Sequence, residues 1–467
     1  MYPTIFIIFG ITGDLSQRKL VPALLSLYVK KQLPRKFSII GFSRRHFTRE
    51  DFRQYIRDNW SVKPGQFKEE DVKHFLDYVS YEQGFFDSPE GYARLATKLK
   101  SIDDSWGQCS NKLFHLAASP DFYDAILDGM AKNNLSVPCA GENEGWTRIL
   151  VEKPFGSNTE TAKKLDKKLA VLFDEDQIFR IDHYLAKESV QNLLTFRFSN
   201  QMFEPLWNKD HIEKIHIKLI EKTGAEGRGA FYDSFGALKD VGQNHVLQML
   251  ALIAMERPKS WNALNIRKER AKIISRLRPI SKKQIGALTV RGQHDGFTRE
   301  EGIHPESKTE TYFRIKAHVD SSRWKNVPFY LESGKGLYES RSEIDVYFKG
   351  PKGDGGERGN ILTFRIQPEE GIKIRFWLKK PGYSNNPSHN SMLETESKVL
   401  KFRYADVPEL AKLPDAYERV FHDAIEGDQT LFTSSEEVIA AWKFITPIVE
   451  HWKDLPLSIY KMGAKEI

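Results

Sequence analysis

The alternation of short apolar segments with amphipathic ones in the first third of the chain constrains its fold most. "TIFIIFG" (4–10) has the composition of a buried strand, "SQRKLVPALLSLYVKKQL" (16–33) has helical periodicity, and "FSIIGFS" (37–43) is strand-like again. Both strand segments are apolar throughout, which is typical of strands covered on both faces. The pattern predicts a Rossmann-like, doubly wound parallel sheet.

Three further segments, "HFLDYVS" (74–80), "KLFHLAA" (112–118) and "TRILVEKPFG" (147–156), are predicted strands of the same sheet. The pattern then changes, because apolar and polar residues alternate in most of the later strand-like segments, as in "TYFRIKAHVD" (311–320). Period two predicts a mostly antiparallel sheet with one wet face. Helix-like segments at 236–257, 415–426 and 434–452 are expected to cover its other face, and "PKGDGGERGN" (351–360) is expected to form a hairpin loop.

We therefore expect two domains, an α/β coenzyme domain over 1–178 and a larger α+β domain over 179–467. The chain of 467 residues is 40% hydrophobic and 28% charged, as globular proteins are. Its net charge of +7 suits anionic partners. The densest basic segment, "IRKERAKIISRLR" (266–278), has the pattern of a solvated helix face, so we expect no nucleic-acid partner.

The chain carries no segment typical of export or membrane insertion. Its start has no basic region of a signal peptide, and "VLQMLALIAM" (246–255) is about half the length that spans a bilayer. Cys109 and Cys139 are too few for a disulfide framework and lack metal-site spacing. We expect a cytoplasmic protein without a membrane partner or a bound metal.

The segment "IIFGITGDLSQRKL" has the features of a phosphate-binding turn. Gly10, Thr12 and Gly13 lie between the first strand and the first helix, in the pattern G-x-x-G-D-L that ends with Asp14 and Leu15. Glycines there let the backbone approach a pyrophosphate, whose charge the helix start favours. The alternative is an ordinary tight turn.

The end of the second strand bears on the choice of coenzyme. An NAD site has an acid there for the ribose 2′-hydroxyl, whereas arginine suits a 2′-phosphate. The chain has Arg44 and Arg45 in "GFSRR" and no acid, which favours NADP. The alternative is two exposed loop arginines.

The segment "RIDHYLAKESVQNLL" (180–194) is predicted to open a helix. In a helix His183, Tyr184 and Lys187 share one face, and three such donors near a helix start suit a phosphoryl group. Asp182 lies to the other side, where it can contact a different group. An ordinary solvated turn, with Asp182 as the N-cap, remains the alternative.

A second polar cluster lies on the predicted helix 236–255. Its polar residues need partners or a wet cleft, and His245 is a candidate general base there, although a lone helix histidine also suits a structural role. Gly242 costs that helix about 1 kcal/mol relative to alanine. Glu221 follows a predicted strand, where its carboxylate either accepts sugar hydroxyls or forms a surface ion pair.

Five blocks occur in order over most of the chain: "GITGDL", "EKPFG", "RIDHYLAKE", "GRGAFYDSFGALKDVGQNHVLQML" and "VPFYLESGKGL". Together they resemble the glucose-6-phosphate dehydrogenase family. The resemblance implies a Rossmann-like domain, a larger domain through which members dimerise, and oxidation of glucose 6-phosphate by NADP to the 1,5-lactone. It implies a homodimer or a homotetramer without distinguishing them.

The resemblance also implies residue roles. His245 matches the base that takes the C1 hydroxyl proton, and Asp182 the carboxylate that orients it. The implied contacts of the sugar 6-phosphate are His183, Tyr184 and Lys187.

Four further residues match ligand contacts of the family. Lys153 of "EKPFG" matches a lysine that touches substrate and coenzyme, and Pro154 matches a proline that is often cis. The implied contacts for the rest of the sugar are Glu221, Asp240 and Lys335.

The coenzyme contacts implied by the family include Arg44 and Tyr123, although a packed core tyrosine is an equal alternative for the latter. The family's second basic residue, five after the Lys335 position, is Ser340 here, with Arg341 beside it. Either phosphate affinity is weaker or Arg341 replaces that residue.

Overall fold

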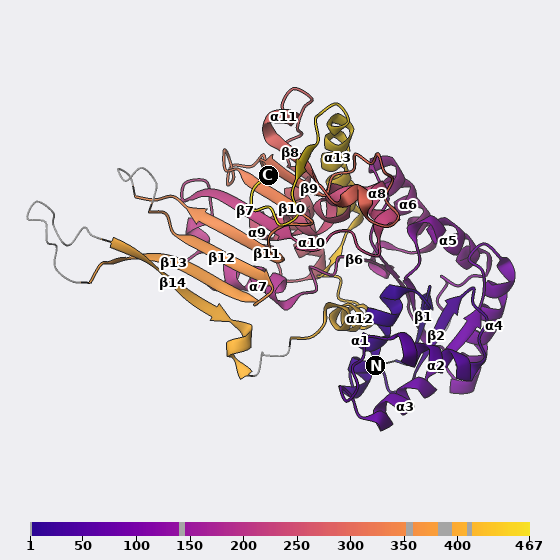
Figure 1. Cartoon of the computed structure of the whole chain (residues 1–467). Coiled ribbons are helices and arrows are strands. Elements are labelled where there is room, and N and C mark those ends of the chain that lie inside the picture. Colours follow the sequence, from indigo (N-terminus) through magenta and orange to yellow (C-terminus); the bar gives the residue numbers. More distant parts are fainter. Residues whose placement is uncertain (1, 140–144, 352–357, 382–394, 409–412) are drawn as a thin grey trace, which may run out of the picture. The chain divides into compact units, whose positions relative to one another are not determined.

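The computed structural model describes residues 2–139, 145–351, 358–381, 395–408 and 413–467. These divide into two compact units (Figure 1). The first contains residues 1–186, 260–267 and 414–439, and the second contains 187–259, 268–413 and 440–467. Within the described part, no helix combines the length and apolar character needed to cross a membrane.

A seven-stranded sheet forms the core of the first unit, in the order β15-β6-β5-β4-β1-β2-β3. All its pairs are parallel except β15–β6, which confirms the predicted doubly wound sheet. Its strands are β1 (Thr4–Phe9), β2 (Phe37–Ser43), β3 (Val79–Gln83), β4 (Asn111–Leu116), β5 (Thr147–Val151), β6 (Ile178–Ile181) and β15 (Phe432–Thr433). β1 and β4 are buried along their whole length, as apolar strands covered on both faces should be.

The helices of the first unit are α1 (Val21–Val29), α2 (Arg49–Asn59), α3 (Glu69–Asp77), α4 (Pro89–Trp106), α5 (Tyr123–Lys132), α6 (Thr159–Leu172) and α12 (Ala416–Glu426). The strand predicted over 74–80 was wrong in its first half, because Phe75 and Leu76 form the buried side of α3. α12 packs on α1 in this unit, so the prediction that it covers the antiparallel sheet was also wrong.

The two cysteines form a disulfide, Cys109–Cys139, which the sequence analysis did not predict. Their Cα atoms lie 6.1 Å apart, within the range that a disulfide spans. Cys109 follows α4 and Cys139 follows α5, so the pair joins the ends of two helices that contact each other.

A nine-stranded sheet forms the second unit, in the order β14-β13-β12-β11-β7-β10-β9-β8-β16, and only β7–β10 and β8–β16 are parallel. The mostly antiparallel sheet is therefore confirmed. Its strands are β7 (Ile212–Ile220), β8 (Thr289–His294), β9 (Tyr312–Ala317), β10 (Phe329–Gly334), β11 (Arg341–Phe348), β12 (Ile361–Gln367), β13 (Gly371–Lys379), β14 (Thr395–Arg403) and β16 (Ser458–Tyr460). Most of the loop predicted over 351–360 lies outside the described residues.

Helices in the second unit are α7 (Glu188–Ser199), α8 (Gly229–Ala237), α9 (Leu247–Ala254) and α11 (Ile285–Leu288), with a π-helical segment, Leu238–Val246, between α8 and α9. α10 (Ala263–Ser275) and α13 (Ser435–Trp452) each contribute residues to both units. α10 has one solvated face, which includes the exposed Lys268, as its charge pattern predicted, while Arg267 and Arg270 are buried on its other side. Arg267 forms an ion pair of 2.7 Å with Glu175.

Candidate active site

The glycine-rich turn joins β1 to a helix that starts as a π-helical segment, Ser16–Leu20. Gly10 has φ +86°, and a Cβ atom there would lie 2.5 Å from the carbonyl oxygen of Ala117. Only glycine fits this position without strain. The Gly13 N–H donates to the Gly10 carbonyl at 2.9 Å, which closes the turn. A close-packed backbone turn at a helix start suits a dinucleotide phosphate.

The arginine loop after β2 is tied to this turn by hydrogen bonds. The hydroxyls of Thr12 and Ser43 lie 2.8 Å apart, and the Tyr55 hydroxyl donates to the Thr12 carbonyl at 3.0 Å. Arg44 and Arg45 follow Ser43 and are exposed. The structure thus brings the glycine turn and both arginines to the same edge of the sheet.

Asp14 and Leu15 complete the turn motif with different surroundings. Asp14 is exposed and forms an i,i+4 ion pair of 2.8 Å with Arg18, while Leu15 is half-buried. An exposed pair of this kind contributes little to stability.

Lys153 follows β5, and its peptide bond to Pro154 is cis, as expected for that proline. Tyr123 supports this strand end, because its hydroxyl donates to the Glu152 carbonyl at 3.0 Å. The Tyr123 side chain is buried, and this burial raises its pKa. Its surroundings favour the packed-core alternative, and contact with a coenzyme stays a prediction.

The segment after β6 forms a turn and not the first turn of a helix. The prediction that His183, Tyr184 and Lys187 share one face of a helix was therefore wrong. Oδ1 of Asp182 accepts from the Tyr184 N–H at 3.0 Å, and this local bond competes with helix formation. α7 begins only at Glu188, and Lys187 is its N-cap residue.

The four candidate residues of this segment differ in their surroundings. Asp182 and Tyr184 are buried and His183 is half-buried, with its ring centroid 5.1 Å from that of Tyr184. These three residues belong to the first unit, whereas Lys187 belongs to the second, where its ammonium donates to the Gln367 side chain.

In the second unit, Glu221 and Lys335 form an ion pair. Their strands, β7 and β10, are parallel neighbours in which Gly334 pairs with Ile220, so each residue lies one position beyond the same edge. The Glu221 N–H donates to the Gly334 carbonyl at 2.8 Å. The two residues therefore lie together because of strand register.

Two residues that the sequence analysis did not select join this cluster. The Lys335 ammonium lies 5.4 Å from the ring centroid of Tyr232, and the Arg228 guanidinium lies 3.7 Å from the buried carboxylate of Asp240. Burial first, and the charge of Asp240 next, raise the pKa of Tyr232. Both residues belong to "GRGAFYD", which was the available signal.

His245 lies in the π-helical segment and is buried. Its backbone N–H donates to the side-chain oxygen of Asn244 at 2.6 Å, while the side-chain amide of Asn244 donates to the Asp240 carbonyl at 2.9 Å. π-Helical turns are rare in proteins, and those that occur are frequently found at functional sites. A Cβ atom on Gly242 would lie 2.6 Å from Cδ1 of the buried Leu238, which accounts for a glycine at this helical position.

A kink precedes the π-helical segment. Gly236 has φ +74°, and a Cβ atom there would lie 2.4 Å from the carboxylate of Glu310. That carboxylate is buried and accepts from the Leu238 N–H at 3.0 Å, so it caps the restarted helix.

Ser340 and Arg341, at the departure from the family pattern, both have partners within the second unit. Arg341 is held by the carboxylates of Glu339 and Glu343, with 3.0 Å to the latter. The Ser340 hydroxyl accepts from the Lys222 N–H at 3.0 Å. Glu343 also pairs with Arg365 at 3.0 Å, so its charge is shared between two arginines, and the replacement of the family's basic residue by Arg341 stays a prediction.

The first unit has a dinucleotide-binding turn on a parallel sheet, and the second unit carries a cluster of carboxylates, a lysine and a buried histidine. This combination is typical of a nicotinamide-dependent oxidoreductase. The sequence matches two family models: "Glucose-6-phosphate dehydrogenase, NAD binding domain" over residues 7–192 and "Glucose-6-phosphate dehydrogenase, C-terminal domain" over 194–466. The chain belongs to the glucose-6-phosphate dehydrogenase family.

Full-length relatives agree with this assignment. The chain is 40% identical to a glucose-6-phosphate 1-dehydrogenase of Borreliella burgdorferi, over 98% of this chain and 94% of the relative. It is also 40% identical to one of Aggregatibacter actinomycetemcomitans, over 95% and 90%. A solved glucose-6-phosphate dehydrogenase in complex with glucose 6-phosphate has a TM-score of 0.89 at 34% identity, with 99% of this chain and 95% of that chain covered.

Proposed function

We propose that this chain oxidises C1 of glucose 6-phosphate with NADP⁺ and releases 6-phospho-D-glucono-1,5-lactone. The observation that carries the proposal is the cluster of Glu221, Lys335 and Asp240 in a chain of this family, since carboxylates and an ammonium together suit sugar hydroxyls. The relatives' names and the substrate in the solved relative support it.

In this proposal His245 accepts the proton of the C1 hydroxyl, and Asp182 orients the imidazole and stabilises its charged form. His183, Tyr184 and Lys187 bind the 6-phosphate through charge-assisted hydrogen bonds. The nicotinamide coenzyme, when bound, supplies the hydride acceptor. These roles come from the family resemblance.

The proposed preference for NADP⁺ is supported by Arg44 at the end of β2, beside the glycine turn. A guanidinium suits the 2′-phosphate, and the loop presents no carboxylate for a free 2′-hydroxyl. In the Arg44→Ala variant, KM for NADP⁺ should rise at least tenfold while KM for NAD⁺ changes less than threefold. Equal changes in KM for the two coenzymes would exclude Arg44 as the contact of the 2′-phosphate.

The test of the main proposal is absorbance at 340 nm with glucose 6-phosphate and NADP⁺. The wild type should produce NADPH, and His245→Asn should lower kcat at least 10³-fold while glucose 6-phosphate still protects the variant from thermal unfolding. Near-normal turnover in His245→Asn would exclude His245 as the base. No turnover by the wild type would exclude the reaction.

We also propose that two copies associate through β13 and β14. In their register, Leu378, Leu400 and Phe402 point to the same face, and all three are exposed. β14 is one of the two edge strands of the nine-stranded sheet (Figure 1). An exposed apolar patch at a sheet edge is typical of a subunit interface.

Finally, we propose a cytoplasmic enzyme whose coenzyme domain, predicted over 1–178, is completed by residues 260–267 and 414–439, and whose substrate and dimerisation domain takes the rest of the range predicted over 179–467. A 35% identical relative of Arabidopsis thaliana, named "Glucose-6-phosphate 1-dehydrogenase 6, cytoplasmic", supports the location. Fractionation of cells that express the tagged chain tests it.

A further inference from the structure

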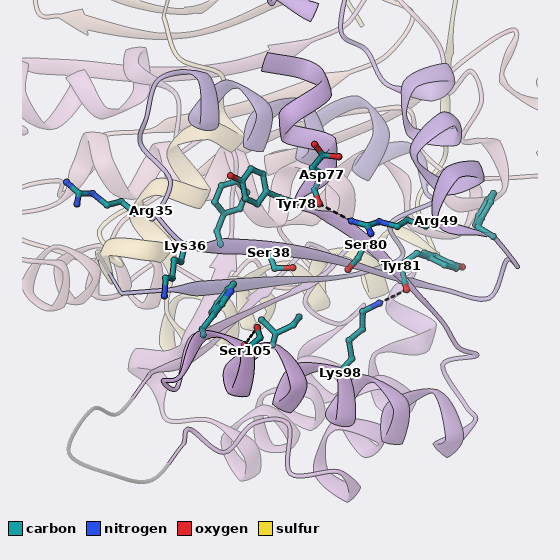
Figure 2. Close-up of a pocket in the computed structure, with 14 residues that line it drawn as sticks. Arg35, Lys36, Ser38, Arg49, Asp77, Tyr78, Ser80, Tyr81, Lys98 and Ser105 are labelled. Atoms are coloured by element: carbon teal, nitrogen blue, oxygen red, sulfur yellow. Dashed lines mark hydrogen bonds between the residues drawn. The ribbon is translucent and has the colours of Figure 1, made fainter. Parts of the chain in front are cut away.

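A cavity of about 710 Å³ lies in the first unit beside β3, the edge strand of the parallel sheet (Figure 2). Its walls come from the start of β2, the start of α2, β3 and the last turns of α4. This volume is within the range of small-molecule sites. The proposed catalytic roles use none of its residues.

The lining of this cavity is strongly basic. Asp77 is the one carboxylate among its described residues, and that charge is already paired with Arg53, which lies outside the lining, at 3.2 Å. The cations of the lining are Arg35, Lys36, Arg49 and Lys98. An anion is therefore the ligand that the charge balance favours.

Lys98 is the cation whose surroundings point most clearly to an anion. Its ammonium donates to the Tyr81 carbonyl at 2.7 Å (Figure 2). The nearest carboxylate, Glu82, is 3.9 Å away and lies closer to Arg94, at 2.8 Å. Burial lowers the pKa of Lys98; Glu82 partly offsets this, and Arg49 lowers it further.

Arg49 approaches the cavity from the start of α2. Its guanidinium donates to the Asp77 carbonyl oxygen at 3.5 Å, a long contact with a neutral group. Arg49 and Lys98 carry like charges, and the charge of Arg49 adds to the effect of burial in lowering the pKa of Lys98. A phosphate bound between them would replace this repulsion with charge-assisted hydrogen bonds.

Aromatic rings form the remaining walls. Phe37 and Tyr78 stack with ring centroids 4.4 Å apart, and Tyr78 is exposed. Trp106, at the end of α4, and Tyr81, on β3, add two further rings to the lining. Such walls suit a flat ring such as a nucleobase.

The cavity differs from the predicted coenzyme site. That site lies at the carboxyl end of β2, whereas Phe37 and Ser38 line the cavity from the amino end of the same strand. Among the lining residues, Tyr81 reaches the other end, because its hydroxyl donates to the Ser43 carbonyl at 2.7 Å. A seven-residue strand separates its ends by roughly 20 Å. Neither Gly10 nor Arg44 lines the cavity.

From this lining we propose a second ligand site beside β3 that binds a nucleoside phosphate, with its phosphate at Lys98 and Arg49 and its base against the aromatic wall. The site is separate from the coenzyme turn and does not depend on the proposed reaction.

The test is equilibrium dialysis of the full chain with radiolabelled ADP in the presence of saturating NADP⁺, which fills the coenzyme site. The wild type should still bind one ADP per chain, and more tightly than it binds pyrophosphate or adenosine. Lys98→Met, which keeps the aliphatic stem and removes the charge, should weaken ADP binding at least tenfold. The matched control Lys100→Met changes an exposed lysine on the same helix outside the lining, and should remain within twofold.

If Lys98→Met fails to fold, Arg49→Gln changes an exposed residue and should weaken ADP binding at least fivefold. Loss of all ADP binding in the presence of NADP⁺ would overturn the proposal, because the coenzyme site would then account for the binding. Equal affinities of Lys98→Met and Lys100→Met would also overturn it. Equal affinities for pyrophosphate and ADP would exclude the nucleoside part.

Discussion

At several positions in this chain, local backbone geometry decides which residue fits or which side chains meet, as much as the chemistry of the side chain does. Gly10 is required by a positive φ and by the Ala117 carbonyl, which lies where a Cβ atom would be. Lys335 and Glu221 meet because β7 and β10 end at the same edge. The phosphate-binding turn therefore depends on the backbone at Gly10, and the pair of Glu221 and Lys335 depends on strand register.

Replacing Gly10 by alanine should destabilise the protein by more than about 3 kcal/mol, since left-handed backbone costs a side chain roughly 1–2 kcal/mol and the overlap adds to it. Gly65 is the matched control, because it also has positive φ, +78°, but a Cβ atom there meets nothing within 4 Å. Gly65→Ala should lose only the backbone cost. Urea unfolding of both variants measures the difference, and equal losses would contradict the overlap.

The sequence predicted those site residues that belong to a local pattern. Glycines before a helix and arginines after a strand are local signals, and the structure brings Gly10 and Arg44 to one edge of the sheet. Tyr232 and Arg228 belong to the block "GRGAFYD", but their contacts with Lys335 and Asp240 depend on how α8 packs against the strand ends, which a local pattern does not give. The block marks the segment, and the folded structure identifies the two side chains within it.

At the scale of elements, strands buried on both faces were predicted well, and junctions were not. The segment 74–80 combines the end of α3 with the start of β3, and apolar residues at both gave one continuous pattern. The segment after β6 kept helical spacing, but the side chain of Asp182 bonds the Tyr184 N–H and delays α7 until Glu188. Local side-chain bonds of this kind do not alter hydrophobic periodicity.

The kink before the π-helical segment should make stability depend on pH. Burial raises the pKa of Glu310, so the folded state binds more protons at this group than the unfolded state does. Stability from this group is thus present below the unfolded pKa of about 4.5 and is lost as pH rises through the raised folded value.

Glu310→Gln keeps an acceptor for the Leu238 N–H and removes the titration. The wild type should therefore lose stability relative to this variant as pH rises from about 4.5 towards 8. Urea unfolding at several pH values measures the difference. A constant difference between the two proteins, or a wild type that gains stability relative to the variant, would contradict the burial argument.

At the scale of the whole molecule, the apolar face of β13 and β14 predicts an assembly. Leu400 is 65% exposed and its neighbour Val399 is 46% exposed, but alternation along β14 places them on opposite faces. Of these two residues, Leu400 is the one that shares a face with Leu378 and Phe402.

Leu400→Lys should therefore convert a dimer into monomers at micromolar concentration, because burying an ammonium in an apolar interface is costly. Val399→Lys introduces the same charge on the other face and should remain dimeric. Sedimentation velocity of both variants distinguishes them. A monomeric wild type, or equal behaviour of the two variants, would exclude this face as the interface.

The first unit is assembled from three separate stretches of the chain, since β15 and α12 return to it from beyond residue 413. A fragment that ends at residue 186 would lack the strand that pairs with β6 and the helix that packs on α1. One genetic crossover after β6 therefore cannot transplant the intact nucleotide-binding half into another enzyme.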